Sequence, residues 1–155
     1  MEITYHQEII APIEIVFDFL NDDEKKKLWM EGLESTEYPK GKNEGNPVGT
    51  IFVQTIGERG NSQEFAGIVT EYKPPTLLAV QLQGSAFRAD VTYELTDRGR
   101  KTDLDYHCDL VFNSLLFRIV GFLFRGLTSR ILKNQMTKLK ELSEQASVRR
   151  SPPQV

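Results

Sequence analysis

The alternation of apolar and polar positions predicts that the chain opens with a β-strand at residues 2–10. One alternating set is expected to face inward, namely Ile3, Tyr5, Gln7 and Ile9. A period of two is typical of a strand with one buried face. Pro12 then ends the strand and suits the first turn of a helix, because proline has no N–H to leave unpaired there.

Two short helices are expected next. Apolar residues recur at helical spacing through residues 12–20, which predicts a short amphipathic helix. A second helix follows, capped by Asn21 or Asp22, and ends before Gly32. Its acidic residues come first and its lysines later, an order that complements the helix dipole.

From residue 33 to residue 112 the pattern changes to short strands separated by clusters of Gly, Pro, Asn and Asp. This pattern predicts an antiparallel meander. The expected strands are 33–38, 48–56, 63–72, 76–83, 86–96 and 101–112. The turn at 57–61 is interpreted as a flexible tip at the rim of a cavity, without the spacing of a phosphate-binding loop.

The clearest hairpin joins the last two strands through residues 97–100. If Asp97 pairs with Arg100, apolar and aromatic residues meet on one face: Tyr93 opposite Leu104, Val91 opposite Tyr106, Ala89 opposite Cys108 and Phe87 opposite Leu110. The other face then pairs Arg88 with Asp109 and Asp90 with His107. Such a sheet is expected to be covered on one side only.

A long final helix is predicted from Leu115 to about Ser143, capped by Ser114. Its first half is apolar on nearly every side, so Phe117, Phe122 and Phe124 cannot all face the sheet. Either the short helices cover this surface, or it contacts a membrane or a second subunit. Residues 146–155 are expected to form a disordered tail.

Composition indicates one globular domain, placed at residues 1–145. The chain has 155 residues, of which 39% are hydrophobic. Its single cysteine, Cys108, and two histidines, His6 and His107, cannot form an intramolecular disulfide or a Cys/His zinc site. We therefore expect no metal and no cofactor. The first residues lack the pattern of a signal peptide, which predicts a cytoplasmic location.

The charge is small overall and unevenly distributed. A formal net charge of −3 argues against nucleic acid as a partner. Residues 1–112 hold 11 Lys and Arg against 20 Asp and Glu, whereas residues 113–155 hold 8 against 2. A basic helix lying on an acidic sheet explains this asymmetry, and an anionic membrane or ligand is the alternative.

The order of strand, two short helices, six strands and long helix resembles the helix-grip fold of the START-like superfamily. This superfamily is also called SRPBCC, and the resemblance is to its polyketide cyclase/dehydrase-like branch. The resemblance is carried by Ile10-Ala11-Pro12 before Val16-Phe17, Trp29, Gly49-Thr50, residues 67–75 and the leucine-spaced last helix. It implies an α+β fold whose curved, seven-stranded antiparallel sheet wraps around the long helix and leaves a cavity for a hydrophobic or amphipathic ligand.

Twelve residues are candidates for lining that cavity. They are Tyr5, Gln7, Trp29, Phe87, Val91, Tyr93, Leu104, Tyr106, Cys108, Leu123, Leu127 and Ile131. The apolar members would bury a lipophilic molecule, and the tyrosines and Gln7 would orient it. The alternative, that these side chains simply fill the core, stays open at this point.

No catalytic set is apparent in the sequence. His107 is flanked by Asp105 and Asp109, but this spacing places all three on the outer, polar face. Cys108 is expected to point inward among apolar neighbours, where a thiol is inert. Three functions therefore remain: a carrier of a lipid- or polyketide-like molecule, a cofactor-independent cyclase or dehydratase, and a module that contacts a protein or a membrane.

Overall fold

The structure, a computed structural model, describes residues 1–58 and 60–150, which form seven strands and four helices. The strands are β1 Glu2–Ile9, β2 Leu33–Glu37, β3 Ile51–Glu58, β4 Asn61–Lys73, β5 Leu77–Gln83, β6 Phe87–Asp97 and β7 Thr102–Phe112. The helices are α1 Ile13–Asn21, α2 Asp23–Trp29, α3 Leu115–Leu123 and α4 Arg125–Arg150. Residue 59, in the predicted flexible tip, and residues 151–155, in the predicted tail, lie outside the described residues.

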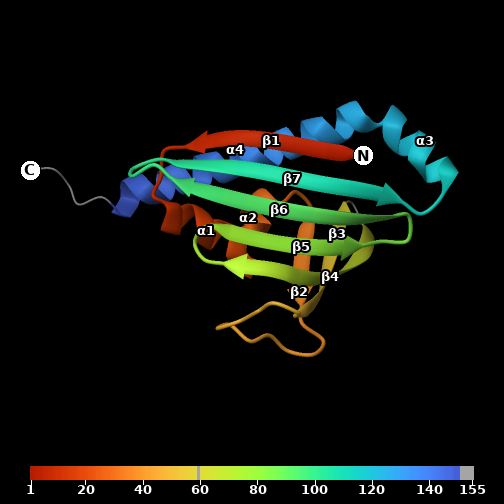
Figure 1. Ribbon diagram of the computed structural model, residues 1–155, viewed down its shortest axis with the longest axis horizontal. Helices are drawn as coiled ribbons and strands as arrows, with labels where there is room; N and C mark the ends of the chain where they lie inside the picture. The colour runs from red at the N-terminus through yellow and green to blue at the C-terminus, as the bar shows by residue number, and fades with distance from the viewer. Residues whose placement is uncertain (59, 151–155) are drawn as a thin grey trace, which may run out of the picture.

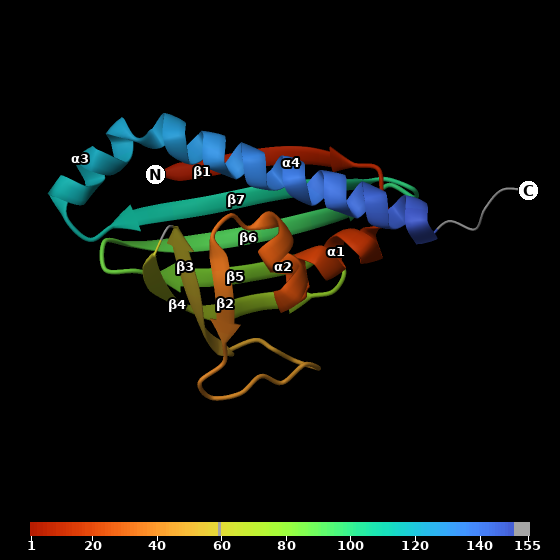
Figure 2. The same ribbon diagram turned by 180° about the vertical axis from the view of Figure 1, so that it is seen from behind.

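One antiparallel sheet carries the fold, with its strands in the order β1-β7-β6-β5-β4-β3-β2. Strands β2 and β3 run across the direction of β6 and β7, so the sheet is strongly curved (Figures 1 and 2). Figure 2 shows α1, α2 and α4 on one face of this sheet, and α4 contacts β1, α1 and α2. The predicted helix-grip α+β fold, with two short helices after the first strand, is confirmed.

The core lies between the sheet and the part of α4 from Leu132 onward. Leu132, Met136 and Leu139 point into it at helical spacing, and Met136 and Leu139 are fully buried. Leu104 from β7 and Leu20 from α1 are fully buried on the facing side. The amphipathic part of α4 therefore holds the helix against the sheet.

Local capping fixes where two of the helices begin. The side chain of Asp22 accepts hydrogen bonds from the backbone N–H groups of Glu24 and Lys25, both at 3.0 Å. Of the two predicted caps of α2, Asp22 is therefore the one that the structure uses. Ser114 caps α3 as predicted, accepting from the N–H of Phe117 at 3.2 Å.

The hairpin between β6 and β7 has a register that differs by two residues from the predicted one. Asp97 pairs with Thr102 rather than with Arg100, so Tyr93 lies opposite Tyr106 and Val91 opposite Cys108. The turn is longer than expected because Asp97 accepts from the N–H of Gly99, whose φ is 79°, and Arg98 donates to the carbonyl of Lys101. A shift of two keeps every side chain on its predicted face.

The predicted partners on the outer face change with this shift. Arg88 lies opposite Val111, Asp90 opposite Asp109 and Thr92 opposite His107. Arg88 instead forms an ion pair with Asp90 on its own strand, at 3.6 Å.

The last helix is divided, whereas the sequence predicted one continuous helix. The division falls at Phe124, where φ and ψ are −96° and 14°. Beyond it α4 continues to Arg150, so residues 146–150 are helical rather than part of a tail. The division turns α3 away from the line of α4 at one end of the molecule, as Figures 1 and 2 show.

Candidate functional site

A cavity of about 230 Å³ lies between the curved sheet, α2 and α4. Alternation along the strands points side chains of β3, β5 and β6 into it, including Phe52, Val80 and Val91. Most of its lining is apolar. Gln54, Tyr93 and Tyr106 add polar atoms from the sheet, and Gln135 adds an amide from α4.

Trp29 and Tyr93 form one wall of the cavity. The indole N–H of Trp29 donates to the carbonyl of Phe19 at 2.8 Å, which fixes the ring in a buried position. The rings of Trp29 and Tyr93 meet edge to face at 6.3 Å, and those of Tyr93 and Tyr106 at 5.4 Å. This chain of aromatic contacts holds the two rings in place.

Burial strengthens the preference of these tyrosines for the neutral form. It raises the pKa of both Tyr93 and Tyr106 far above the ordinary value of 10.0. Both phenols are therefore neutral at physiological pH, at which they can donate hydrogen bonds but cannot act as bases. Burial also raises the pKa of the Cys108 thiol, which lies in the core and not at the cavity wall.

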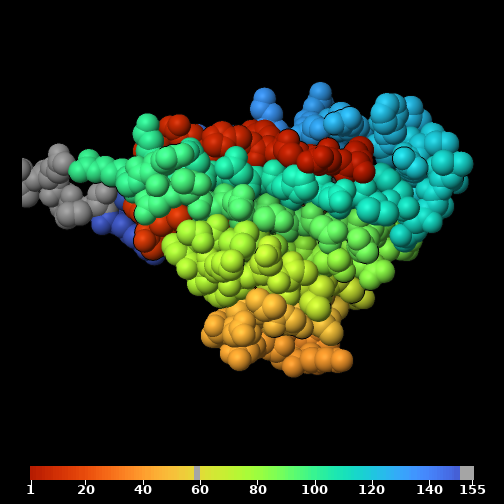
Figure 3. Space-filling model, viewed as in Figure 1, coloured from red at the N-terminus to blue at the C-terminus, as the bar shows by residue number. Residues whose placement is uncertain are grey.

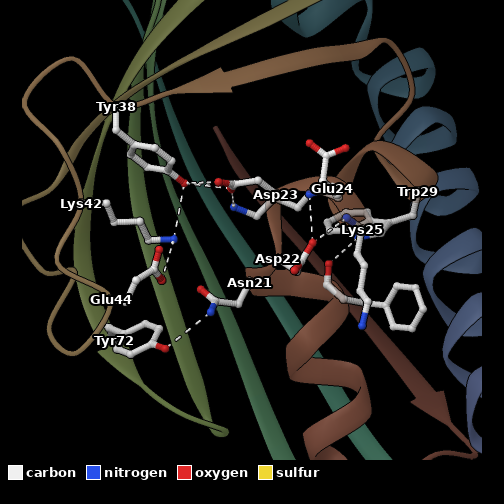
Figure 4. Close-up of polar contacts among 12 residues, drawn as sticks. Asn21, Asp22, Asp23, Glu24, Lys25, Trp29, Tyr38, Lys42, Glu44 and Tyr72 are labelled. Carbon is white, nitrogen blue, oxygen red and sulfur yellow. Dashed lines mark hydrogen bonds and ion pairs between the residues drawn. The ribbon is translucent and has the colours of Figure 1, made fainter.

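Polar and charged side chains gather at one end of the cavity, where α2 faces the segment that follows β2. Lys26 of α2 and Lys42 of that segment both line the cavity, together with Asn21 and Tyr38. Figure 4 shows Tyr38, Lys42 and Glu44 on one side of this end and Asn21 and Asp23 on the other.

Asp23 is the centre of the hydrogen bonding at this end. The hydroxyl of Tyr38 donates to its carboxylate, with both O–O distances at 2.8 Å, and Lys26 Nζ lies 3.3 Å from Oδ1. Lys42 Nζ lies 3.5 Å from the Tyr38 hydroxyl and 3.7 Å from Glu44 Oε2. Burial lowers the pKa of Lys26, although the nearby carboxylate of Asp23 partly opposes this effect.

The structure brings four of the twelve candidate residues to this cavity, namely Trp29, Val91, Tyr93 and Tyr106. Tyr5, Gln7 and Phe87 lie half-buried on the predicted inner face but outside its lining, and Tyr5 donates to Gln7 Oε1 at 3.3 Å. Leu104 and Cys108 are packed in the core.

The three candidates from the last helix lie elsewhere. Leu123, Leu127 and Ile131 are all exposed, and Leu123 is 72% exposed. The reason is that only the part of α4 from Leu132 onward presents buried residues to the core. Leu123 instead lines an open groove of about 860 Å³ between α3 and the end of β7.

Sequence reasoning missed the polar end of the cavity. Gln54 did carry a signal, because it shares an inward position with Phe52 in an alternating strand and is a polar residue there. Lys26 and Lys42 carried none, since each stands in a polar stretch whose position against the sheet depends on tertiary structure.

The lining limits what chemistry the cavity can perform. Within residues 1–58 and 60–150, no Asp, Glu or His side chain lines it. Its titratable groups are Lys26, Lys42 and the phenols of Tyr38, Tyr93 and Tyr106. In the same ranges, no group of three or more His, Cys, Asp or Glu side chains is placed to hold a metal ion.

A family model described as polyketide cyclase/dehydrase and lipid transport matches residues 1–144 of this chain. The chain therefore belongs to that family, and its fold is the helix-grip fold of START-like proteins. No curated relative matches the sequence.

Solved structures with the same fold are distant in sequence. A START superfamily protein from Mycobacterium smegmatis has a TM-score of 0.75 at 18% identity, covering 94% of this chain and 98% of its own. The Zhui aromatase/cyclase from Streptomyces sp. R1128 has a TM-score of 0.74 at 11% identity, covering 93% of each chain. Protein CV1439 from Chromobacterium violaceum has a TM-score of 0.73 at 16% identity, covering 93% and 98%.

Proposed function

We propose that this protein binds and carries a small amphipathic molecule in the cavity between the sheet and α4. The observation that carries the proposal is a largely apolar cavity, polar at one end, whose described lining includes no carboxylate or histidine. Such a lining stabilises a bound molecule by burial and orients it through a few polar groups. The family, described as including lipid transport, supports the same function.

The size of the cavity limits the size of the ligand. Its volume of about 230 Å³ falls below the roughly 300–1,000 Å³ of typical ligand pockets. A single aromatic nucleus or one short acyl chain fits that space, whereas a complete two-chain phospholipid would have to leave most of its mass outside.

Native mass spectrometry of the protein purified from its own host tests this function. We expect a lipophilic molecule at one per chain that is lost on unfolding. An environment-sensitive naphthalene dye should bind the emptied protein and be displaced by the extracted molecule. A folded protein that retains no molecule and binds no dye would contradict the proposal.

A pair of matched variants tests whether the dye binds in this cavity. Val80→Phe places a larger side chain into the cavity, and we expect dye affinity to fall by about tenfold or more. Val53→Phe adds the same volume to β3 on the face opposite Phe52 and Gln54, and should leave affinity unchanged.

A cyclase or dehydratase is the second candidate, supported by the neutral phenols of Tyr93 and Tyr106 at the cavity wall. In that function they would donate hydrogen bonds to a substrate carbonyl and polarise it. The structural similarity to an aromatase/cyclase concerns the fold alone. Turnover of a polyketide-like substrate that survives both Tyr93→Phe and Tyr106→Phe would argue against this assignment.

We also propose that α3 and the start of α4 contact an anionic membrane surface. Leu115, Leu116, Phe122 and Leu123 are each about 70% exposed, and no residue of α3 is buried. The space-filling view in Figure 3 shows α3 at a projecting end of the molecule. Exposed apolar surface of this kind marks an interaction site.

Charge favours a membrane over a second copy of the chain as the partner. Arg118, Arg125, Arg130 and Lys133 are exposed along this segment, and residues 114–140 hold no acidic residue. Two such segments would repel each other, whereas each basic residue near an anionic bilayer contributes about 1 kcal/mol. None of the described helices is long and apolar enough to cross a bilayer, so the contact proposed is peripheral.

Flotation with phosphatidylcholine vesicles containing phosphatidylserine tests this contact. We expect the protein to float, and the double variant Arg118→Glu with Arg125→Glu to remain at the bottom. The control, Arg100→Glu with Lys101→Glu, makes the same charge change at the β6–β7 turn, far from α3 in Figure 1, and should float. Flotation unaffected by the first double variant, or a stable dimer in sedimentation, would overturn the proposal.

A further inference from the structure

The polar end of the cavity holds more hydrogen-bond donors than its neighbours can accept. Lys26 and Lys42 each carry three N–H donors, and their side chains are only 16% and 13% exposed. Among the described residues, Lys26 has Asp23 as its acceptor, while Lys42 has the Tyr38 hydroxyl and Glu44. Each ammonium group therefore has N–H donors that no side-chain oxygen among the described residues accepts.

The counter-charges at this end are also poorly placed to neutralise both cations. Asp23 divides its carboxylate between Lys26 and the Tyr38 hydroxyl. Glu44 lies 3.7 Å from Lys42 with 80% of its side chain exposed, so water screens its charge. Lys42 also disfavours the charged form of Lys26, which indicates that the two cations are close enough to repel each other.

Gln54 supplies an independent observation that points to a ligand. The residue is only 5% exposed, and its side chain lines the cavity. Its amide makes no hydrogen bond to any other part of the described chain. The register of β2 and β3 pairs Gln54 with Thr36, two residues before Tyr38 in the chain, so Gln54 lies near the start of the segment that carries Lys42. An amide that lines the cavity and has no partner in the protein is free to hydrogen-bond a ligand bound there.

We propose that the ligand carries an oxyanion, either a carboxylate or a phosphate, which binds between Lys26 and Lys42 and accepts a further hydrogen bond from Gln54. The apolar part of the ligand then lies against Phe52, Val80 and Val91. This inference rests on the proposed carrier function and adds the chemical class of the ligand. Charge-assisted hydrogen bonds to an oxyanion are roughly twice as strong as those between neutral groups, so the polar end selects among molecules with equal apolar parts.

Three probes with ten carbon atoms each distinguish the contribution of the head group from that of the tail. Decanoate, decyl phosphate and decanol are titrated against the full-length protein by calorimetry and by displacement of the naphthalene dye. We expect at least one of the anions to bind about tenfold or more tightly than decanol. If decanoate binds more tightly, the head group is a carboxylate; if decyl phosphate binds more tightly, it is a phosphate.

Matched variants assign the preference to the two lysines. Lys26→Met and Lys42→Met should each remove most of the preference for the anion while leaving decanol affinity within about twofold. Lys27→Met is the control, because Lys27 pairs with Glu24 and does not line the cavity. Lys42 lies outside the helices and strands, so its variant provides the test if Lys26→Met does not fold.

The outcomes separate the two proposals. If decanol binds as tightly as both anions, the carrier function stands and the oxyanion inference fails. If none of the three probes binds a folded protein, the carrier function fails and the oxyanion inference falls with it. A preference for the anions that persists in both Lys26→Met and Lys42→Met would also overturn the site assignment.

Discussion

At the scale of single residues, two fully buried hydroxyl groups differ in whether they have a partner. Thr102 Oγ1 donates to the carbonyl of Ala11 at 2.8 Å and so connects the start of β7 to the segment after β1. The hydroxyl of Ser143, on the buried face of α4, has no hydrogen-bond partner in the described part of the chain. A buried polar atom stabilises the fold only when it is paired, so the two should respond to removal in opposite directions.

The first prediction follows from this contrast. Ser143→Ala should raise the free energy of unfolding by about 1 kcal/mol, because it removes a hydroxyl that is dehydrated without compensation. Thr102→Val should lower it by about 1–3 kcal/mol, since the Ala11 carbonyl loses its donor. Urea unfolding of both variants measures the difference. A loss of stability in Ser143→Ala would mean that this hydroxyl is paired in solution.

At the scale of elements, α3 approaches the end of β7 closely at Gly121. A Cβ atom added at Gly121 would lie 2.2 Å from Cζ of Phe112, the last residue of β7. Real Cβ atoms essentially never come that close to another atom, so with a Cβ at this position either the Phe112 ring or α3 has to move. Gly126, near the start of α4, has no atom within 4 Å of its added Cβ.

The second prediction uses these two glycines as a matched pair. Gly121→Ala should push α3 away from Phe112 and raise the rate of tryptic cleavage at Arg118 and Arg125. Gly126→Ala should lower that rate or leave it unchanged, because alanine favours a helix by about 1 kcal/mol over glycine and meets no neighbour. Limited proteolysis followed by mass spectrometry distinguishes the sites. Equal cleavage in both variants would show that the Phe112 contact does not hold α3.

At the scale of the whole molecule, burial of the aromatic cavity wall links global stability to alkaline pH. The native state keeps Tyr93 and Tyr106 protonated at a pH where the tyrosines of the unfolded chain, with an ordinary value of 10.0, lose their protons. The native state therefore binds more protons than the unfolded state above that pH. This contribution to stability is complete below pH 10 and is lost as the pH rises further.

The third prediction is a steep loss of stability above about pH 10, near 1.4 kcal/mol per pH unit for each of these two tyrosines. Lys26 acts in the opposite direction, because burial lowers its pKa from 10.5 and the unfolded chain then holds the extra proton. Urea unfolding across the alkaline range measures the slope. Tyr93→Phe should make it shallower by about one tyrosine's share, and an unchanged slope would contradict the assignment.

Much of the fold was predictable from short-range pattern. Inward and outward faces of the strands, the cap Ser114, the pair Asn21 and Asp22 as candidate caps of α2, and the order of elements follow from alternation, helical spacing and turn residues. These signals act over a few neighbouring residues, so they are readable in the chain itself. The register of the β6–β7 hairpin was wrong by two residues, because Gly99 and the Asp97 side chain stabilise a longer turn than the spacing suggested.

The candidate site was predictable only in part. Trp29, Val91, Tyr93 and Tyr106 reach the cavity because the inward face of a strand and the apolar face of a short helix are local properties. Leu123, Leu127 and Ile131 satisfy the same helical spacing but lie exposed. Spacing identifies an apolar face of a helix, and it cannot show where along its length that helix leaves the sheet.

From the sequence by itself, the resemblance of the element order identified the family and the helix-grip fold, and local periodicity predicted which side of each strand faces inward. Tertiary structure decided the rest. Curvature of the sheet set the volume of the cavity, the division at Phe124 left α3 uncovered, and the packing of α2 against the segment after β2 brought Lys26 and Lys42 together. Each of these depends on contacts between residues far apart in the chain, and a pattern of neighbouring residues carries no information about such contacts.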